Sequence, residues 1–140
     1  LLAYLIPSRL ASSTAGTASD PQKTGCPSAS ARPGWSAANT IVTEGQEGTT
    51  IQAHVGDTID FRLSAQKFSW NYVPSADRSV AAQTPAGYYD PGLNDCVWRL
   101  KATAAGQTIV AFDRRMLCPP HTSHICSDIV ISWRYVLNTQ

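Results

Sequence analysis

The sequence has few charged residues and no long apolar run. Only 15% of its 140 residues are Asp, Glu, Lys or Arg, against about 25% in an average soluble domain, which disfavours a charge-rich helical bundle. The formal net charge is +1 and no stretch gathers the basic side chains, so we expect no nucleic-acid partner. No segment reaches the ~20 apolar residues of a spanning helix. We expect membrane contact only if a segment before Leu1 anchors the protein.

Motifs that carry catalysis are also missing. The chain has no Gly-x-Ser-x-Gly elbow, no His-Glu-x-x-His pair and no glycine-rich phosphate loop. The two glutamates, Glu44 and Glu47, lie in a glycine-flanked turn. We interpret Asp57 and Asp60 as a turn former and a solvated strand residue. The sequence therefore predicts a protein that is not an enzyme and that holds no cofactor or metal.

The cysteines indicate an oxidising compartment. A small chain rich in Ser, Thr, Gly and Pro with several cysteines is typical of secreted or cell-surface proteins that carry disulfides. Cys118 and Cys126 enclose His121 and His124 in a short loop that begins with two prolines. A disulfide fits this spacing better than a zinc site does, because zinc sites usually join two pairs of ligands that are far apart in the sequence. The expected disulfides are Cys118 with Cys126 and Cys26 with Cys96, and the alternative is Cys96 with Cys118.

Residues 1–38 are predicted to form an extended arm. They are dominated by Ser, Ala, Thr, Gly and Pro without helical or strand periodicity, and they begin with an apolar stretch like the end of a secretory signal segment. Such a tail is normally mobile unless something holds it. It is expected to pack on its own domain, on a neighbouring subunit or on a membrane surface, and the assembly function below depends on the neighbouring subunit. The contact residues expected in this arm are Leu1, Leu2, Tyr4, Leu5 and Ile6.

The remainder, residues 39–140, is predicted to be a β-sandwich. Short runs that alternate apolar and polar residues recur about every ten residues and are separated by turn residues. No window carries the helical apolar spacing, so the fold class is all-β, with antiparallel sheets. Trp70 is the candidate for the centre of the core. Strands are expected at 51–55, 59–63, 68–72, 79–81, 96–102, 108–112 and 129–137, the last one long and central.

Two connections in this domain are expected to have particular forms. Residues 83–94 contain two prolines and two glycines, which predicts a long loop. The strands on either side of Gly106 are predicted to pair as a hairpin whose odd-length turn places Gly106 at a positive φ.

Two segments resemble the chagasin-type inhibitors of papain-like cysteine proteases. The first is VGDTIDFRL at 55–63, followed by Trp70, and the second is VWRLKATAAGQTIVAFDRR at 97–115. The resemblance spans about sixty residues. It implies an immunoglobulin-like β-sandwich that presents three loops at one end, and these loops enter a protease cleft without being cut.

The three loops implied by the resemblance are residues 64–69, 92–95 and 114–118. The family usually carries Asn-Pro-Thr-Thr-Gly, Gly-x-Gly and Arg-Pro-Trp there, whereas this chain has SAQKFS at 64–69, GLN at 92–94 and RML at 115–117. The expected contact residues are Gln66, Lys67, Gly92, Leu93, Asn94, Arg114, Arg115 and Met116.

Two functions are predicted, and both act through protein contact. The first is a structural or accessory subunit of an extracellular or cell-surface assembly. It is expected to be oligomeric and held through its arm, which lies on a neighbouring subunit or adds a strand to the open sheet edge of that neighbour. The second is inhibition of papain-like cysteine proteases. A glycan-binding module that uses Trp35, Tyr88 and Tyr89 as exposed aromatic surfaces is a third alternative.

Overall fold

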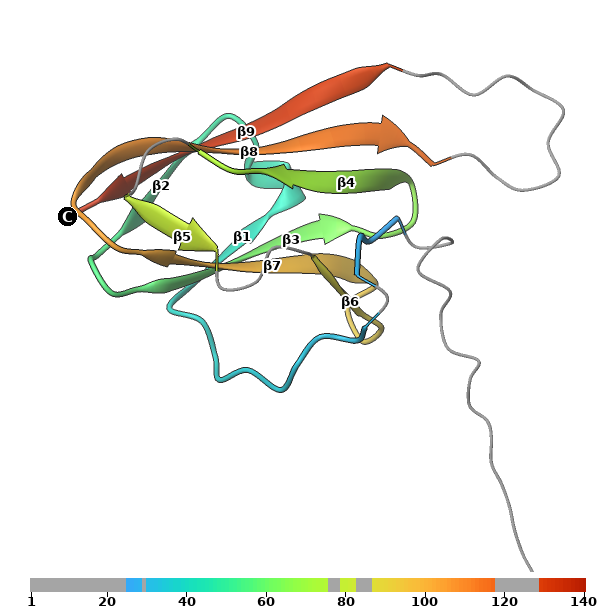
Figure 1. Cartoon of the computed structure of the whole chain (residues 1–140), viewed down its shortest axis with the longest axis horizontal. Helices are drawn as coiled ribbons and strands as arrows, with labels where there is room; N and C mark the ends of the chain where they lie inside the picture. The colour runs from blue at the N-terminus through green and yellow to red at the C-terminus, as the bar shows by residue number, and fades with distance from the viewer. Residues whose placement is uncertain (1–24, 29, 76–78, 83–86, 118–128) are drawn as a thin grey trace, which may run out of the picture.

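A computed structural model shows two packed β-sheets. It describes residues 25–28, 30–75, 79–82, 87–117 and 129–140, and none of its described helices is long and apolar enough to cross a membrane. The elements are β1 (Thr40–Thr43), the 3-10 turn η2 (Glu44–Gln46), β2 (Thr50–Ala53), β3 (Thr58–Ser64), β4 (Phe68–Val73), β5 (Val80–Ala82), β6 (Tyr88–Asp90), β7 (Asp95–Ala102), β8 (Gly106–Met116) and β9 (Val130–Thr139) (Figure 1).

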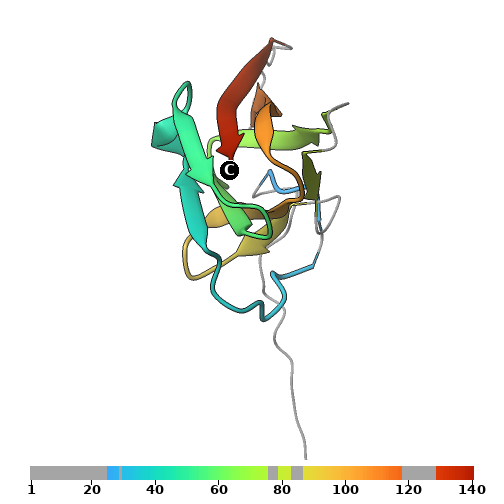
Figure 2. The same ribbon diagram turned by 90° about the vertical axis from the view of Figure 1, so that its left-hand side faces the viewer.

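The strands form an immunoglobulin-like β-sandwich, as predicted. One sheet has the order β1-β3-β7-β5, with β6 also paired to β7, and the other has the order β2-β9-β8-β4 (Figure 2). The long strand β9 is central in its sheet, which confirms that prediction. The sheets are mixed, however, because β1 runs parallel to β3 and β2 runs parallel to β9. The turn η2 carries the chain from the edge of one sheet to the edge of the other, so one stretch supplies an edge strand to each.

The inner faces of the two sheets meet in an aromatic core. Trp70, the predicted central residue, is 1% exposed, and Phe61, Trp98, Phe112 and Tyr135 are fully buried. The ring of Phe112 lies 5.0 Å from that of Trp98 and 5.6 Å from that of Phe61, measured between centroids. The alternating apolar residues of the sequence therefore form the core expected of them.

The predicted hairpin around Gly106 is wrong. Gly106 does have a positive φ of 134°, but β7 and β8 belong to different sheets, and the chain crosses between the sheets there. Their apolar faces meet across the core, where Trp98 contacts Phe112. Two strands that each have one apolar face can bury it side by side or face to face, and periodicity does not distinguish the two arrangements.

Two strands lie where none was predicted. β1 opens the sandwich, and β6 lies within the predicted loop 83–94, where it pairs with β7.

Asp60 is 3% exposed, which contradicts its interpretation as a solvated residue. Its carboxylate accepts two hydrogen bonds from the guanidinium of Arg99, at 2.7 and 2.9 Å, and this partner explains its burial.

The described part of the arm, residues 25–28 and 30–38, lies against the sandwich. The backbone N–H of Trp70 on β4 donates to the carbonyl of Gly25 at 3.2 Å, and the N–H of Arg32 donates to the carbonyl of Tyr89 on β6 at 3.1 Å. Because β4 and β6 belong to different sheets, this segment bridges the two sheets on one side of the molecule.

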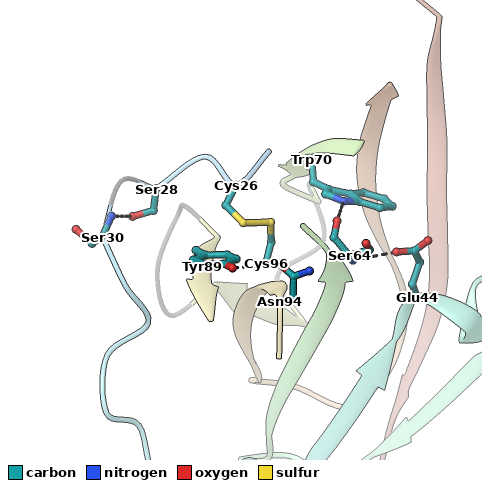
Figure 3. Close-up of a disulfide and its surroundings, with 9 residues drawn as sticks. All are labelled: Cys26, Ser28, Ser30, Glu44, Ser64, Trp70, Tyr89, Asn94 and Cys96. Atoms are coloured by element: carbon teal, nitrogen blue, oxygen red, sulfur yellow. Dashed lines mark hydrogen bonds between the residues drawn. A yellow bond between two sulfur atoms is a disulfide. The ribbon is translucent and has the colours of Figure 1, made fainter. Parts of the chain in front are cut away.

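A disulfide fastens the same segment to β7. Cys26 and Cys96 are bonded, as predicted, and are 5% and 0% exposed (Figure 3). The alternative pairing of Cys96 with Cys118 is therefore wrong. The other predicted disulfide, between Cys118 and Cys126, lies outside the described residues.

Candidate protein-contact site

The three predicted contact loops come together at one end of the sandwich. The N–H of Ala65 donates to the carbonyl of Asn94 at 3.1 Å, and the N–H of Leu117 donates to the carbonyl of Lys67 at 3.0 Å. Backbone hydrogen bonds thus join the first loop to both of the others. We call residues 64–69, 92–95 and 114–117 the loop end; it lies opposite the C-terminus in Figure 1.

The first loop is held by side chains from other elements. The N–H of Ser64 donates to the carboxylate of Glu44 in η2 at 2.9 Å, and the indole Nε1–H of Trp70 donates to the carbonyl of Ser64 at 2.8 Å (Figure 3). Gln66 and Lys67, at the tip of the turn, are exposed. The start of this short loop, Ser64, is therefore fixed on both its N–H and its carbonyl while the tip of the loop faces solvent.

The second loop is a tight turn organised by Asp90. The side chain of Asp90 accepts the N–H of Gly92 at 3.0 Å, and its carbonyl accepts the N–H of Asn94 at 2.8 Å. Asn94 has a φ of 56°, a left-handed conformation that asparagine adopts more readily than most residues. Its side-chain oxygen also accepts the hydroxyl of Tyr89 at 3.1 Å. Leu93, at the tip, is 43% exposed.

The third segment is the end of β8, where an arginine lies between two aromatic rings. The guanidinium carbon of Arg114 is 4.0 Å from the ring centroid of Phe68 and 4.3 Å from that of Trp133, distances at which cation–π attraction is effective. Arg115 and Met116 are exposed, Met116 by 58%. We infer that Arg114 positions the strand, while Arg115 and Met116 are available for contact.

The charges at the loop end are mainly positive and exposed. Lys67 and Arg115 face solvent, whereas the acidic residue of this end, Asp95, is half-buried. Burial raises the pKa of the Asp95 carboxyl above its ordinary value, and the nearby positive charge of Arg62 partly offsets this rise.

In the core, burial raises the pKa of Tyr135 to about 12. Its hydroxyl therefore stays protonated and donates to the carbonyl of Thr43 at 3.0 Å.

The other residues predicted to bind a partner or ligand do not belong to the loop end. Leu1, Leu2, Tyr4, Leu5 and Ile6 lie outside the described residues. Trp35, Tyr88 and Tyr89, the residues of the glycan alternative, are half-buried. The rings of Trp35 and Tyr88 pack edge to face 5.6 Å apart, and the guanidinium of Arg99 lies 4.8 Å above Trp35. No group of three metal-ligating side chains occurs in the described part of the chain.

Sequence reasoning missed the residues that hold the loops in place. Glu44 supports Ser64 from twenty positions away, and neither its turn context nor its spacing signals this contact. Asn94 was expected only as a contact residue, but its carbonyl and side chain both bind within the domain. An asparagine next to a Pro-Gly turn is a signal for a left-handed residue, and it was available in the sequence.

Two solved structures are similar to this chain. A cysteine protease inhibitor of Entamoeba histolytica, EhICP2, is 16% identical, and amebosin, known from a solution structure, is 18% identical. Each alignment covers 74% of this chain and 100% of the other, with a TM-score of 0.48. No protein-family model and no curated protein matches the sequence.

Proposed function

We propose that the chain is a secreted, non-catalytic inhibitor of papain-like cysteine proteases and that the loop end enters the protease cleft. The observation that carries the proposal is the joining of the three loops, through Ala65 to Asn94 and Leu117 to Lys67. Segments far apart in the sequence thereby form one continuous surface at the end where the resemblance expects it.

The chemistry of this surface suits contact with another protein. Its tips carry the apolar side chains of Leu93 and Met116, which are 43% and 58% exposed, beside the cations of Lys67 and Arg115. Apolar, methionine and arginine side chains are common at the centre of protein interfaces. Because internal hydrogen bonds hold the loops, little conformational entropy is lost on binding.

The assembly role predicted from the arm is not carried forward. The described arm residues, 25–28 and 30–38, are held on the chain's own sandwich by the disulfide and by hydrogen bonds to β4 and β6. Residues 1–24 lie outside the described residues. The inhibitor function is thus the one that the described geometry supports best.

The test is inhibition of papain by the protein and by two matched variants. The unaltered chain is expected to inhibit at about 1 μM or below. Met116→Asp places a charge in the centre of the proposed contact and is expected to raise the inhibition constant ~30-fold or more, the effect of losing a binding hot spot. Val55→Asp is the control, since Val55 is 53% exposed at the opposite end of the sandwich, and it is expected to inhibit normally.

Two results would overturn the proposal. One is full protease activity at a large excess of correctly folded protein. The other is inhibition by Met116→Asp as strong as that by the unaltered chain and by Val55→Asp, because the loop end would then not make the contact.

A further inference from the structure

Part of the central strand β9 has an open edge. On one side β9 pairs with β8 along its length, from Arg115 opposite Val130 to Gly106 opposite Thr139. On the other side β2 covers only residues 136–139. Among the described residues, Val130 to Trp133 of β9 therefore have a sheet neighbour on one side only, as is visible where β9 runs past β2 in Figure 1.

The hydrogen bonds at the end of β2 show which residues face this edge. The carbonyl of Arg134 accepts the N–H of Gly48 at 2.8 Å, and the N–H of Val136 donates to the carbonyl of Thr49 at 3.0 Å. Backbone groups alternate in direction along a strand, and the pairing with β8 is continuous without a bulge. The N–H and C=O groups of Val130 and Ser132 must therefore point to the open edge.

The side chains around this edge favour strand addition. Residues 129–133 read Ile-Val-Ile-Ser-Trp, without charge, proline or glycine. Val130 is 41% and Ile131 43% exposed. Natural proteins usually protect an open edge with a charge, a proline or a bulge, and none of these devices occurs between residues 129 and 133.

We propose that this edge pairs with the same edge of a second copy of the chain. The two β9 strands would run antiparallel, with Ile131 facing Ile131 of the second copy on the two-fold axis. Val130 would then lie opposite Ser132 of the second copy, and Ser132 opposite its Val130. This register satisfies all four open backbone groups of each strand at once, in four hydrogen bonds.

A second copy meets the requirements of this edge, because the open groups are symmetric about Ile131. A two-fold interface requires a self-complementary surface, and two open residues on either side of one apolar residue provide it. Gly48 limits the open edge, since it occupies the position beside Arg134. Such a short contact is well below the area of a stable dimer, so the pairing is expected to be weak and dependent on concentration.

Cysteine cross-linking tests the register directly. Directly opposed residues of a non-hydrogen-bonded antiparallel pair have Cα atoms about 4.5 Å apart, within the range of a disulfide. Ile131→Cys is therefore expected to give a covalent dimer in most of the protein on mild oxidation at roughly 100 μM, a concentration suited to a weak interface. The dimer should disappear on reduction in a denaturing gel.

Two variants with the same added thiol control for chance collisions. Val130→Cys has nearly the same exposure as Ile131→Cys, but its counterpart lies two positions away in the proposed register, too far for a disulfide. In the other variant, Ile109→Cys, the thiol replaces a residue near the start of β8, where the native Ile109 is 49% exposed. Both are expected to stay monomeric in the gel.

Sedimentation of variants without new cysteines gives a second readout. The unaltered chain is expected to show a rise in average mass with concentration, and Ile131→Lys, which places like charges opposite each other, is expected to remain monomeric. Ile109→Lys should behave like the unaltered chain. Equal cross-linking of Ile131→Cys and Val130→Cys, or a monomer at all concentrations, would overturn the proposal. Papain inhibition is measured separately, so this result and the inhibitor test stand independently.

Discussion

Replacing Cys26 and Cys96 together by alanine is expected to lower the free energy of unfolding by about 4 kcal/mol. The disulfide joins residues 70 positions apart, and a cross-link of that span removes a large loop-closure entropy from the unfolded chain. It also fastens residues 25–38, which bridge the two sheets. Urea denaturation of the variant and of the unaltered chain, monitored by tryptophan fluorescence, measures the difference.

The same variant should lose structure at a particular place. Cys96 follows the second contact loop directly, and the disulfide holds Cys26 beside it (Figure 3). We expect faster amide hydrogen exchange in residues 25–38 and 88–95, while residues 135–139 of β9 keep their protection under native conditions. A loss of less than about 1 kcal/mol would contradict the account, since it falls below the usual effect of removing a native disulfide.

Replacing Arg99 by leucine is expected to destabilise the fold by about 3–5 kcal/mol. The Arg99 and Asp60 side chains are 6% and 4% exposed, and the guanidinium also donates to the carbonyl of Ser36 at 2.7 Å. Removing Arg99 alone leaves a buried carboxylate without its cation. Denaturant unfolding at pH 7 measures the effect.

The double variant Asp60→Leu with Arg99→Leu serves as the control for this prediction. With both charges replaced by apolar side chains, no buried charge remains, and most of the lost stability is expected to return. Arg99→Lys is expected to fall between them, because lysine cannot reproduce the two-pronged hydrogen bond to the carboxylate. If the single and double leucine variants were equally unstable, the burial of an unpaired charge would not be the cause.

Most strands could be predicted because apolar and polar residues alternate along them, although β7 buries residues of both faces from Cys96 to Leu100. The alternation is illustrated by Ile59, Phe61 and Leu63 on β3 and by Trp70 on β4, whose positions in the core follow from period-two alternation alone. The crossing at Gly106 did not follow, because alternation says which residues are buried and not which strand lies beside which. Strand neighbours depend on contacts across the whole domain.

The contact site was predictable in part. The three loops were located from the resemblance, and the disulfide between Cys26 and Cys96 from the composition and the compartment it implies. The supports of the loops were not predictable, because Glu44 and Asn94 act through long-range hydrogen bonds to backbone groups. Likewise, the burial of Asp60 depends on its partner Arg99, which is 39 positions away in the sequence.

The protection of backbone amides in a mixture with papain tests the central claim most directly. If the loop end enters the protease cleft, exchange at residues 66–67, 92–93 and 116–117 should slow about tenfold or more when papain is in excess. Residues 55–57, in the turn between β2 and β3, should exchange at an unchanged rate. Unchanged exchange throughout the loop end, or slowing confined to residues 55–57, would contradict the claim.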